Sequence, residues 1–422
     1  MTKEHITEYA KIVGAFVIMM LARLIIVRHR PKNVAITGTV GKTTAKDMVA
    51  RVLGTRFSVR HNIKSYNSEM GIALTIIGAE SPAHSGVRGW AYVAWRGIVA
   101  LFRRTYPTWL VLEVGVDKPG DMDAIAGWLK PRIAVITAFG EIPAHVENFE
   151  SPEQLMAEKA KIVNYIERGG ALLLNADDPN VMKLKAKATC KVYTYGIRAE
   201  ADINATHAHA IYNEINVHRP VTGLNFKMNF EGHSIPFTLS GVLGDVYVYP
   251  VIASIMLGVS LGIPAVESAQ ALGQYTPAPR RMNIVAGRNN SIIIDDTYNA
   301  SPLSMQSALT TLKKVEARGL KIAVIGDMLE IGRYSHSAHK QLGELIAHVP
   351  VDFLVTVGIR AEIAAEAAYM AKLHKSKIRC FKSAENAIEE VQKLQKKTKG
   401  SIILIKGSHA MGMEKIAEAC CA

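Results

Sequence analysis

The sequence predicts an α/β protein built around a mostly parallel sheet, with a phosphate-binding loop in its first domain. Three observations support this class. Continuous apolar runs of strand length alternate with helical stretches, as in a parallel sheet covered on both faces. A glycine-rich turn at 37–44 separates the first such run from a helical segment. A second α/β series follows the proline-rich segment at 276–279, so we expect two successive α/β domains.

The elements follow in chain order. A hydrophobic helix is expected in 1–32, before a central P-loop ATPase domain at 33–275 and a C-terminal Rossmann-like domain at 276–422. Buried strands of the central domain are predicted at 34–36, 110–114, 133–137 and 171–175, followed by an antiparallel region from 202 to 239 where short segments alternate. Strands of the C-terminal domain are predicted at 291–294, 322–325, 353–357 and 402–405.

The composition fits a globular protein with anionic partners. The chain has 422 residues and a formal net charge of +13, which suits nucleotides, acidic precursors or anionic lipid surfaces. We expect no nucleic-acid partner, because the sequence has no zinc finger, aromatic RNA-binding signature or long basic tail. The four cysteines show neither metal-ligand spacing nor a disulfide framework, so we expect a cytoplasmic protein. We also expect a monomer.

Two segments have the composition of helices at a membrane surface. Residues 12–27 are apolar except for Arg23, a stretch shorter than the about 20 residues that a spanning helix needs. Residues 87–104 carry aromatic side chains among arginines at helical spacing, which is typical of an interfacial helix. Two interpretations stay open. The segments contact the inner face of the cytoplasmic membrane, or they pack on each other or on the body of the protein.

The phosphate-binding loop is the stretch Thr37–Thr44, Thr-Gly-Thr-Val-Gly-Lys-Thr-Thr. The first N–H groups of a helix have no partner inside the helix, so a glycine turn that opens a helix binds anions. Lys42 can reach the outer phosphates of a nucleotide, and the Thr43 hydroxyl can bind Mg²⁺. The usual pattern places a glycine where Ile36 stands. The alternative is a tight glycine turn beside an exposed lysine, but the order of strand, turn and helix favours ATP binding.

Further candidates follow the strands of the central domain. Glu113 lies at the end of a buried strand, where a carboxylate near a P-loop can bind Mg²⁺. A lone histidine on a loop is usually solvated, but His145 follows the strand at 133–137, and this position makes it a candidate for a metal role. Ser151 and Pro152 predict a helix start, and the residues alone indicate that Lys159 and Lys161, further along that helix, lie on the surface.

Polar clusters also follow three strands of the C-terminal domain. Asp295-Asp296-Thr297-Tyr298-Asn299 follows the first, Gly326-Asp327-Met328-Leu329-Glu330 the second and Lys406-Gly407-Ser408 the last. Such runs are too polar for a core, so we expect one shared binding edge that faces the ATP site across the proline-rich segment.

Together these motifs resemble the Mur ligase family, which forms amide bonds through acyl phosphates. The matching motifs run from Val34 to near the C-terminus, and Asp-Asp-Thr-Tyr-Asn-Ala-Ser-Pro and Gly-Asp-Met-Leu-Glu-Ile-Gly are the most discriminating. They are most similar to the member that adds D-alanyl-D-alanine to a UDP-muramyl-tripeptide precursor. The resemblance implies ATP and Mg²⁺ as cofactors and a role in building the cell wall.

The resemblance also implies roles for single residues. Catalytic and metal-binding roles fall on Lys42, Thr43, Glu113, His145 and Lys159, with Lys159 matching a lysine that the family carbamylates. Nucleotide contacts fall on Gly38, Thr39, Gly41, Lys42, Thr43, Thr44, Arg281, Asp296 and Asn299. Contacts with the incoming amino component fall on Asp327, Glu330, Lys406 and Ser408.

The chain also departs from the family pattern. Only about thirty residues, mostly apolar, precede the phosphate loop, so we expect the usual UDP-binding domain to be missing. Arg280 and Ala138 stand where the family usually has glycine and asparagine. Two alternatives to the D-alanyl-D-alanine ligase stay open. One is a related amide ligase with another acceptor, as in polyglutamate or cyanophycin synthetases, and the other is an inactive, membrane-associated nucleotide-binding scaffold.

Overall fold

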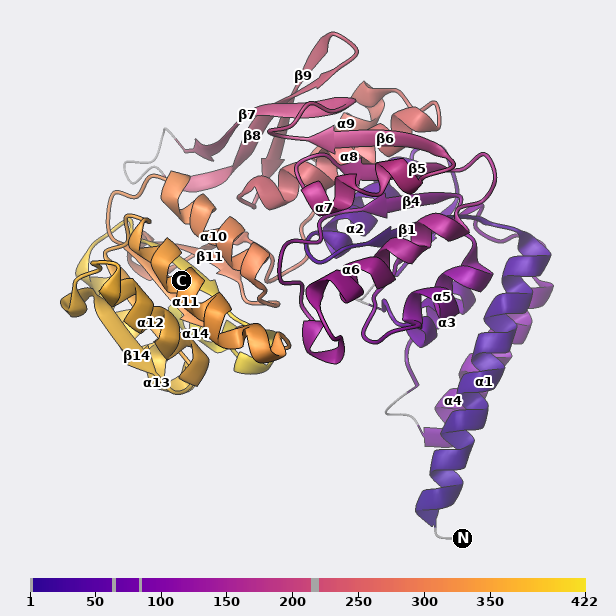
Figure 1. Cartoon of the computed structure of the whole chain (residues 1–422), viewed down its shortest axis with the longest axis horizontal. Helices are drawn as coiled ribbons and strands as arrows, with labels where there is room; N and C mark the ends of the chain where they lie inside the picture. The colour runs from indigo at the N-terminus through magenta and orange to yellow at the C-terminus, as the bar shows by residue number, and fades with distance from the viewer. Residues whose placement is uncertain (1–2, 63–65, 83–85, 214–219) are drawn as a thin grey trace. The chain divides into compact units, whose positions relative to one another are not determined.

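The chain folds into two compact units, each assembled from separated segments of the sequence (Figure 1). The first unit comprises residues 1–138, 153–202 and 253–272, and the second comprises 139–152, 203–252 and 273–422. The computed structural model describes residues 3–62, 66–82, 86–213 and 220–422, with the side chains of 3–11 left out. Residues 1 and 2 of the predicted helical segment 1–32 thus lie outside the described residues. The domain boundaries expected from the sequence remain a prediction.

The first unit contains a parallel sheet in the order β2-β3-β1-β4-β5-β6. Its strands are β1 (Lys32–Thr37), β2 (Val59–His61), β3 (Trp109–Glu113), β4 (Ile133–Ile136), β5 (Ala171–Asn175) and β6 (Lys191–Gly196). Strands β1, β3 and β4 are almost wholly buried, as expected for apolar runs covered on both faces. In the register Ile36 lies beside Glu113 and Thr37 beside Ile136, so the carboxyl ends of these three strands meet at one edge.

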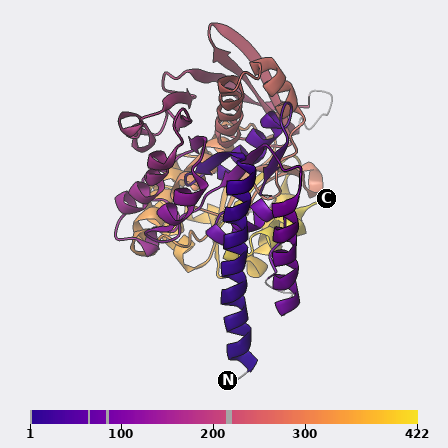
Figure 2. The ribbon, with the colours of Figure 1, turned by 90° about the vertical axis from the view of Figure 1, so that its right-hand side faces the viewer.

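Helix α1 (Lys3–His29) precedes β1, and the helices that follow it connect the strands of this unit. They are α2 (Lys42–Leu53), α3 (Glu69–Ile77), α4 (Gly86–Phe102), α5 (Asp121–Leu129), α6 (Pro152–Ala160) and α7 (Pro179–Met182). Helices α1 and α4 lie side by side and extend from the unit (Figure 2). Among the described residues, one stretch, Ile12–His29 of α1, is long and apolar enough to cross a bilayer by length and composition, and 22% of it is buried in the protein.

An antiparallel region follows along the chain, as the alternating pattern predicts. It consists of β7 (Ile203–Tyr212), β8 (Val221–Phe230) and β9 (His233–Ser240). Along β8, buried and exposed residues alternate for much of the strand, the pattern of a sheet with one solvated face. Helices α8 (Asp245–Ser260) and α9 (Ala265–Gly273) come next.

The second unit also contains a six-stranded sheet in the order β10-β11-β15-β12-β13-β14, parallel except for β10. The strands are β10 (Asn283–Ala286), β11 (Ile292–Asp296), β12 (Lys321–Gly326), β13 (Phe353–Val357), β14 (Ile378–Phe381) and β15 (Ile402–Lys406). The helices are α10 (Pro302–Lys314), α11 (Ser335–Ala347), α12 (Ile359–Met370), α13 (Ala384–Lys397) and α14 (Glu414–Cys420). Its core includes Ile293, Val324, Val355 and Ile405 from four neighbouring strands.

The α/β class, the mostly parallel sheet, the C-terminal α/β domain and the apolar N-terminal helix are confirmed. Each strand predicted for the C-terminal domain is present within two residues of its expected bounds. The short or half-exposed strands β2, β6, β10 and β14 were not predicted. Three of them, β2, β10 and β14, lie at sheet edges, where a strand needs no continuous apolar run.

Candidate functional site

The phosphate loop joins the end of β1 to the start of α2. Gly41 precedes α2 with φ 82°, and Gly38 has φ 142°, both in the region that favours glycine. A Cβ on Gly38 would lie 2.1 Å from the Thr137 hydroxyl, so only glycine fits beside the end of β4. The Thr39 N–H donates to the carbonyl of Ala138 at 2.6 Å, which ties the loop to that strand. The loop thus presents the first N–H groups of α2 at the carboxyl edge of the sheet.

Glu113 lies at the foot of this loop. It is only 2% exposed, and its Oε2 accepts a hydrogen bond of 2.7 Å from the Thr43 hydroxyl. Its Oε1 lies 3.4 Å from the amide nitrogen of Asn67. The backbone N–H of Glu113 donates to the side chain of Asn62, and the buried Lys46 ammonium donates to the Asn62 carbonyl at 2.5 Å. Lys46, Asn62 and Asn67 therefore hold Glu113 in place, although no motif in the sequence pointed to them.

Lys159 of α6 reaches the same loop from the other side. Its ammonium lies 3.4 Å from the Thr39 hydroxyl, while the Lys42 ammonium donates to the Thr39 carbonyl at 3.3 Å. Lys159 is 3% exposed, so the expectation of a surface lysine is wrong, because α6 turns this side chain into the unit. Burial, followed by the charge of Lys42, lowers the pKa of Lys159 well below its usual value. Lys161 is half-exposed and pairs with Asp123 and Glu158.

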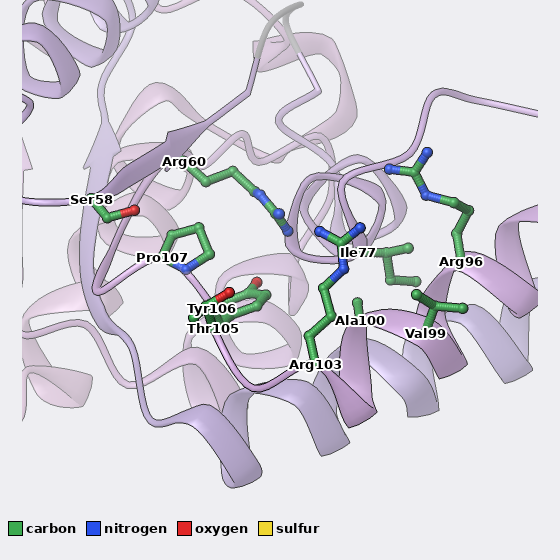
Figure 3. Close-up of a pocket in the computed structure, with 10 residues that line it drawn as sticks. All are labelled: Ser58, Arg60, Ile77, Arg96, Val99, Ala100, Arg103, Thr105, Tyr106 and Pro107. Atoms are coloured by element: carbon green, nitrogen blue, oxygen red, sulfur yellow. The ribbon is translucent and has the colours of Figure 1, made fainter.

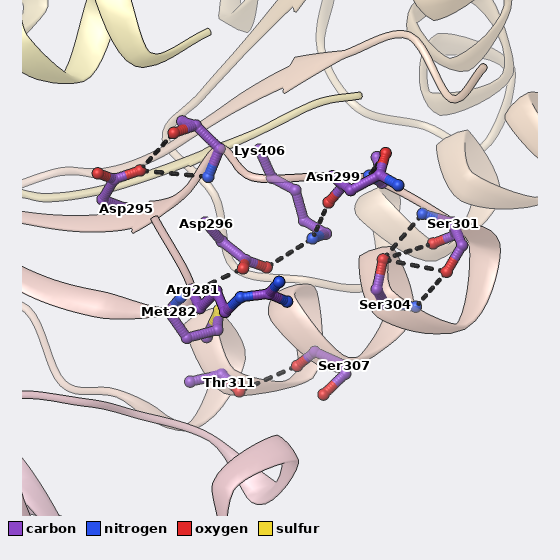
Figure 4. A network of polar contacts seen from close by, with 12 residues as sticks. Arg281, Met282, Asp295, Asp296, Asn299, Ser301, Ser304, Ser307, Thr311 and Lys406 are labelled. Carbon is purple, nitrogen blue, oxygen red and sulfur yellow. Dashed lines mark hydrogen bonds and ion pairs between the residues drawn. The ribbon is translucent and has the colours of Figure 1, made fainter. Parts of the chain in front are cut away.

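A second polar cluster occupies the carboxyl edge of the sheet in the second unit (Figure 4). Lys406, at the end of β15, is 1% exposed and contacts the Asp296 carboxylate at 2.6 Å and the Asn299 carbonyl at 2.8 Å. These neighbours follow from the sheet register, which pairs Asp296 with Lys406. The Arg281 guanidinium lies over the Tyr298 ring, 3.8 Å from its centre. The predicted nucleotide residues Arg281, Asp296 and Asn299 are thus brought together with Lys406.

The other residues predicted for the amino component lie in separate contacts. One oxygen of Asp327 accepts the Ala361 N–H of the first turn of α12 at 2.7 Å, so this carboxylate caps a helix. The Ser408 N–H donates to the Asp327 carbonyl at 3.0 Å, which places these two residues side by side. Glu330 instead contacts His145, with 3.2 Å between Oε2 and Nδ1. The four predicted residues therefore divide into three groups.

His145 belongs to the second unit, whereas Thr43, Glu113 and Lys159 belong to the first. It has φ 68° and precedes the short 3-10 helix η1 (Val146–Asn148). Within the described residues, no group of three or more histidine, cysteine, aspartate or glutamate side chains is arranged to bind a metal. Any metal at the phosphate loop would therefore also need ligands of other kinds, such as hydroxyl or phosphate oxygens.

A strand, glycine turn and helix beside a buried carboxylate define a P-loop nucleotide-binding protein. Residues 36–258 match the Mur ligase middle domain, and residues 280–409 match the Mur ligase, glutamate ligase domain. The chain belongs to the Mur ligase family, as the sequence motifs suggested.

Several relatives of this chain share one name. A UDP-N-acetylmuramoyl-tripeptide–D-alanyl-D-alanine ligase of Bacillus subtilis is 27% identical over 401 residues, which cover 95% of this chain and 78% of the relative. The crystal structure of MurF from Acinetobacter baumannii has a TM-score of 0.79 at 23% identity, covering 96% of this chain and 80% of that one. MurF ligase from Thermotoga maritima, in complex with ADP, gives a TM-score of 0.76 at 23% identity, with coverage of 96% and 83%.

Proposed function

We propose that this chain is an ATP-dependent peptide ligase that joins D-alanyl-D-alanine to a UDP-N-acetylmuramoyl-tripeptide precursor in peptidoglycan synthesis. Family membership and the names of the relatives support this reaction. The observation that carries the proposal is the geometry of the phosphate loop. The Thr43 hydroxyl donates a hydrogen bond to the buried Glu113 carboxylate, and the Lys42 ammonium donates one to the Thr39 carbonyl. A complete set of these residues favours an active ATP-dependent enzyme over an inactive scaffold.

The reaction proceeds in two steps. A carboxylate oxygen of the precursor attacks the γ-phosphoryl group of ATP, which forms an acyl phosphate and releases ADP. The dipeptide amine then attacks the acyl carbon, loses a proton, and inorganic phosphate leaves with the electrons of the broken C–O bond. Both reactants of the first step are anions. Lys42 and the positive end of α2 lower their repulsion and stabilise charge on the phosphoryl oxygens.

The residues at the phosphate loop fit Mg²⁺. The Thr43 hydroxyl and the Glu113 carboxylate offer hard oxygen ligands 2.7 Å apart, and Mg²⁺ prefers such ligands together with substrate phosphates. When bound, the ion would neutralise phosphate charge. The resemblance adds His145 as a ligand.

We propose that Lys159 becomes carbamylated, as the family resemblance implies. Its burial and its lowered pKa favour the neutral amine, which is the form that attacks CO₂. A new N–C bond forms, the nitrogen loses a proton, and two oxygens share one negative charge. Beside Thr39, the unmodified chain has the amino groups of Lys42 and Lys159. Carbamylation would replace the second of these with an anion.

The second polar cluster would hold the nucleotide. Arg281 on the Tyr298 ring offers a fixed guanidinium, and Asp296 and Asn299 lie within the same cluster. Lys406 donates hydrogen bonds to Asp296 and Asn299, so a contact between Lys406 and the amino component would require these hydrogen bonds to be shared or replaced. Asp327, Glu330 and Ser408 remain candidates for the amino component.

The enzyme would act as a monomer in the cytoplasm, at the inner face of the cytoplasmic membrane. Small-molecule and peptide substrates would be its reaction partners, and no nucleic acid takes part. The exposed apolar side chains of α1 and α4 support the membrane location.

The test is phosphate release from ATP in the presence of UDP-muramyl-tripeptide and D-alanyl-D-alanine. We expect turnover that depends on both, with the ligated pentapeptide as product. Lys42→Ala should abolish turnover, and circular dichroism should show an unchanged fold. Turnover with glutamate alone would instead identify a polyglutamate-type ligase. ATP binding without turnover on any acceptor would identify a scaffold, and near-normal turnover of Lys42→Ala would remove the phosphate-loop assignment.

A further inference from the structure

Helices α1 and α4 form a parallel pair within the first unit (Figure 2). Gly14 lies against Trp90, and Gly97 lies against Leu21, so glycines let the helices approach closely. At the carboxyl end of the pair, the His29 ring contacts the Ala100 carbonyl at 3.0 Å. The two segments that the sequence singled out therefore do pack on each other.

Their outer face nevertheless remains exposed and apolar. We call this surface the α1–α4 face, made of Ile12, Val13, Phe16, Met20, Leu24 and Val27 on α1 and of Val87, Tyr92, Trp95, Ile98 and Phe102 on α4. Phe16 and Phe102 are 66% and 69% exposed. Their spacing forms one stripe along each of the two adjacent helices, and exposed apolar stripes of this kind are typical of an interaction surface.

Basic residues border the carboxyl end of this face. Arg28 and Arg30 follow its stripe on α1, and Arg103 and Arg104 follow its stripe on α4. Residues 12–30 and 86–104 contain no aspartate or glutamate. An apolar surface with a basic border is the composition of elements that lie on anionic lipid.

A cavity of about 270 Å³ opens at the carboxyl end of α4 (Figure 3). Its lining includes three arginines, Arg60, Arg96 and Arg103, together with Tyr106, and no acidic residue. Arg60 and Arg96 each give one N–H to a carbonyl at the end of α3, at 2.6 and 2.7 Å. A guanidinium carries five N–H donors, so both retain others for an anion in the cavity. Figure 3 shows Arg103 extending from α4 toward Arg60.

The packing of α1 favours lying on a membrane over crossing it. Ile18 and Ile25 are fully buried in the protein. Arg23, in the middle of the apolar stretch, pairs with Glu69 of α3 at 3.1 Å and lies over the Trp128 ring of α5. A spanning helix would have to give up these contacts and place Arg23 in hydrocarbon, which is costly.

We propose that the α1–α4 face docks on a bilayer rich in anionic phospholipid, and that the cavity of Arg60, Arg96 and Arg103 binds the phosphate of one lipid headgroup. The apolar stripes enter the boundary between headgroups and acyl chains, and the arginines bind phosphate above it. Docking does not depend on the ligase reaction, so a vesicle-binding assay can fail or succeed independently of the turnover assay.

The test is flotation of the full chain with vesicles of phosphatidylglycerol and phosphatidylcholine, compared with phosphatidylcholine alone. We expect binding only with phosphatidylglycerol present, and release by alkaline carbonate. Arg103→Gln and Arg104→Gln remove the same charge from the same helix end, but only Arg103 lines the cavity. Loss of one basic residue at an anionic surface should lower the partition coefficient about fivefold for Arg104→Gln. Arg103→Gln should lower it roughly tenfold further, because it also loses charge-assisted hydrogen bonds.

Each other result overturns part of the proposal. Equal losses in the two variants would remove the headgroup site, and absence of binding to phosphatidylglycerol vesicles would remove the docking surface. Resistance to carbonate would mean that α1 spans the bilayer. A dimer in sedimentation velocity that Trp95→Ser dissolves would assign the face to a second copy of the chain. Arg360→Gln, an exposed charge removed from α12, controls for net charge and should bind as the unaltered chain does.

Discussion

Replacing Lys406 by methionine tests the second polar cluster directly. The side chains of Lys406 and Asp296 are 2% and 13% exposed, and their charged atoms lie 2.6 Å apart. The same ammonium also donates to the Asn299 carbonyl at 2.8 Å. Methionine keeps the apolar stem of the lysine but leaves the Asp296 charge nearly buried without its cation.

The cost follows from this burial. An exposed ion pair contributes up to about 1 kcal/mol, whereas removing one partner of a buried pair costs about 3–5 kcal/mol. Because Asp296 keeps some exposure and also accepts the Met282 N–H at 3.2 Å, we expect the lower end, about 3 kcal/mol of unfolding free energy. Asp296→Asn leaves the ammonium unmatched and should cost a similar amount. The double variant should cost clearly less than the sum of the two.

The assay is urea unfolding of the full chain, followed by tryptophan fluorescence and circular dichroism, for the four members of this mutant cycle. A coupling free energy of at least about 1.5 kcal/mol would support a buried pair. If Lys406→Met costs less than about 1 kcal/mol and the cycle shows no coupling, the pair is solvated and the reasoning from burial fails. Lys393→Met, at a residue whose contact with Glu390 is 4.0 Å and mostly exposed, is the control and should change stability little.

Three further predictions concern other sites. Glu113→Gln keeps the shape of the side chain but removes its charge. It should lower kcat by about 100-fold or more and raise the Mg²⁺ concentration needed for half-maximal turnover. An unchanged Mg²⁺ dependence would contradict the metal role. Lys159→Met should abolish turnover yet leave the urea midpoint the same or higher, because it replaces a buried amine, whose charged form is disfavoured by burial and by Lys42, with an apolar side chain. Strong destabilisation would show that Lys159 is a structural ion-pair partner. Burial lowers the pKa of His339, whose Nε2 accepts the Met328 N–H at 3.0 Å. Its contribution to stability is therefore complete above about pH 6.5 and declines as the pH falls below that value, by at most about 1.4 kcal/mol per pH unit. His339→Gln should reduce this slope in thermal unfolding, and an equal slope in both proteins would refute the assignment.

Much of the fold could be predicted because its central strands carry their signal locally. A strand such as β11 or β15 is apolar at nearly every position, since both its faces are covered. The edge strands β2 and β14 lack this signal because one side of each is open. Each of the two compact units is also assembled from separated stretches of the chain, and local composition does not reveal which stretches belong together.

The residues of the candidate site could be predicted where their role requires a particular backbone conformation or a position at the end of a strand. The glycine turn before Lys42 needs unusual backbone angles, so its sequence is distinctive, and Glu113 follows from its place at a strand end. Asn62 and Asn67 hold Glu113 through hydrogen bonds from a connecting segment, and a lone asparagine in a loop has no pattern to reveal it. The pairing of Asp296 with Lys406 depends on the register of two strands far apart in the chain.

Three buried lysines illustrate the limit of reading charge from sequence, since Lys46, Lys159 and Lys406 are each at most 3% exposed. Lys46 contacts Asp47 at 3.1 Å and Lys406 contacts Asp296 at 2.6 Å, so each of these ammonium groups is compensated by a carboxylate. Burial is the largest cause of the lowered pKa of Lys159, and the neighbouring charge that affects it most is a second cation, Lys42. Burial beside a cation destabilises an ammonium group, and a neutral amine is the form that can bind CO₂. The surroundings of Lys159 therefore suit a lysine that works in a modified form, whereas those of the other two suit lysines that hold the fold together.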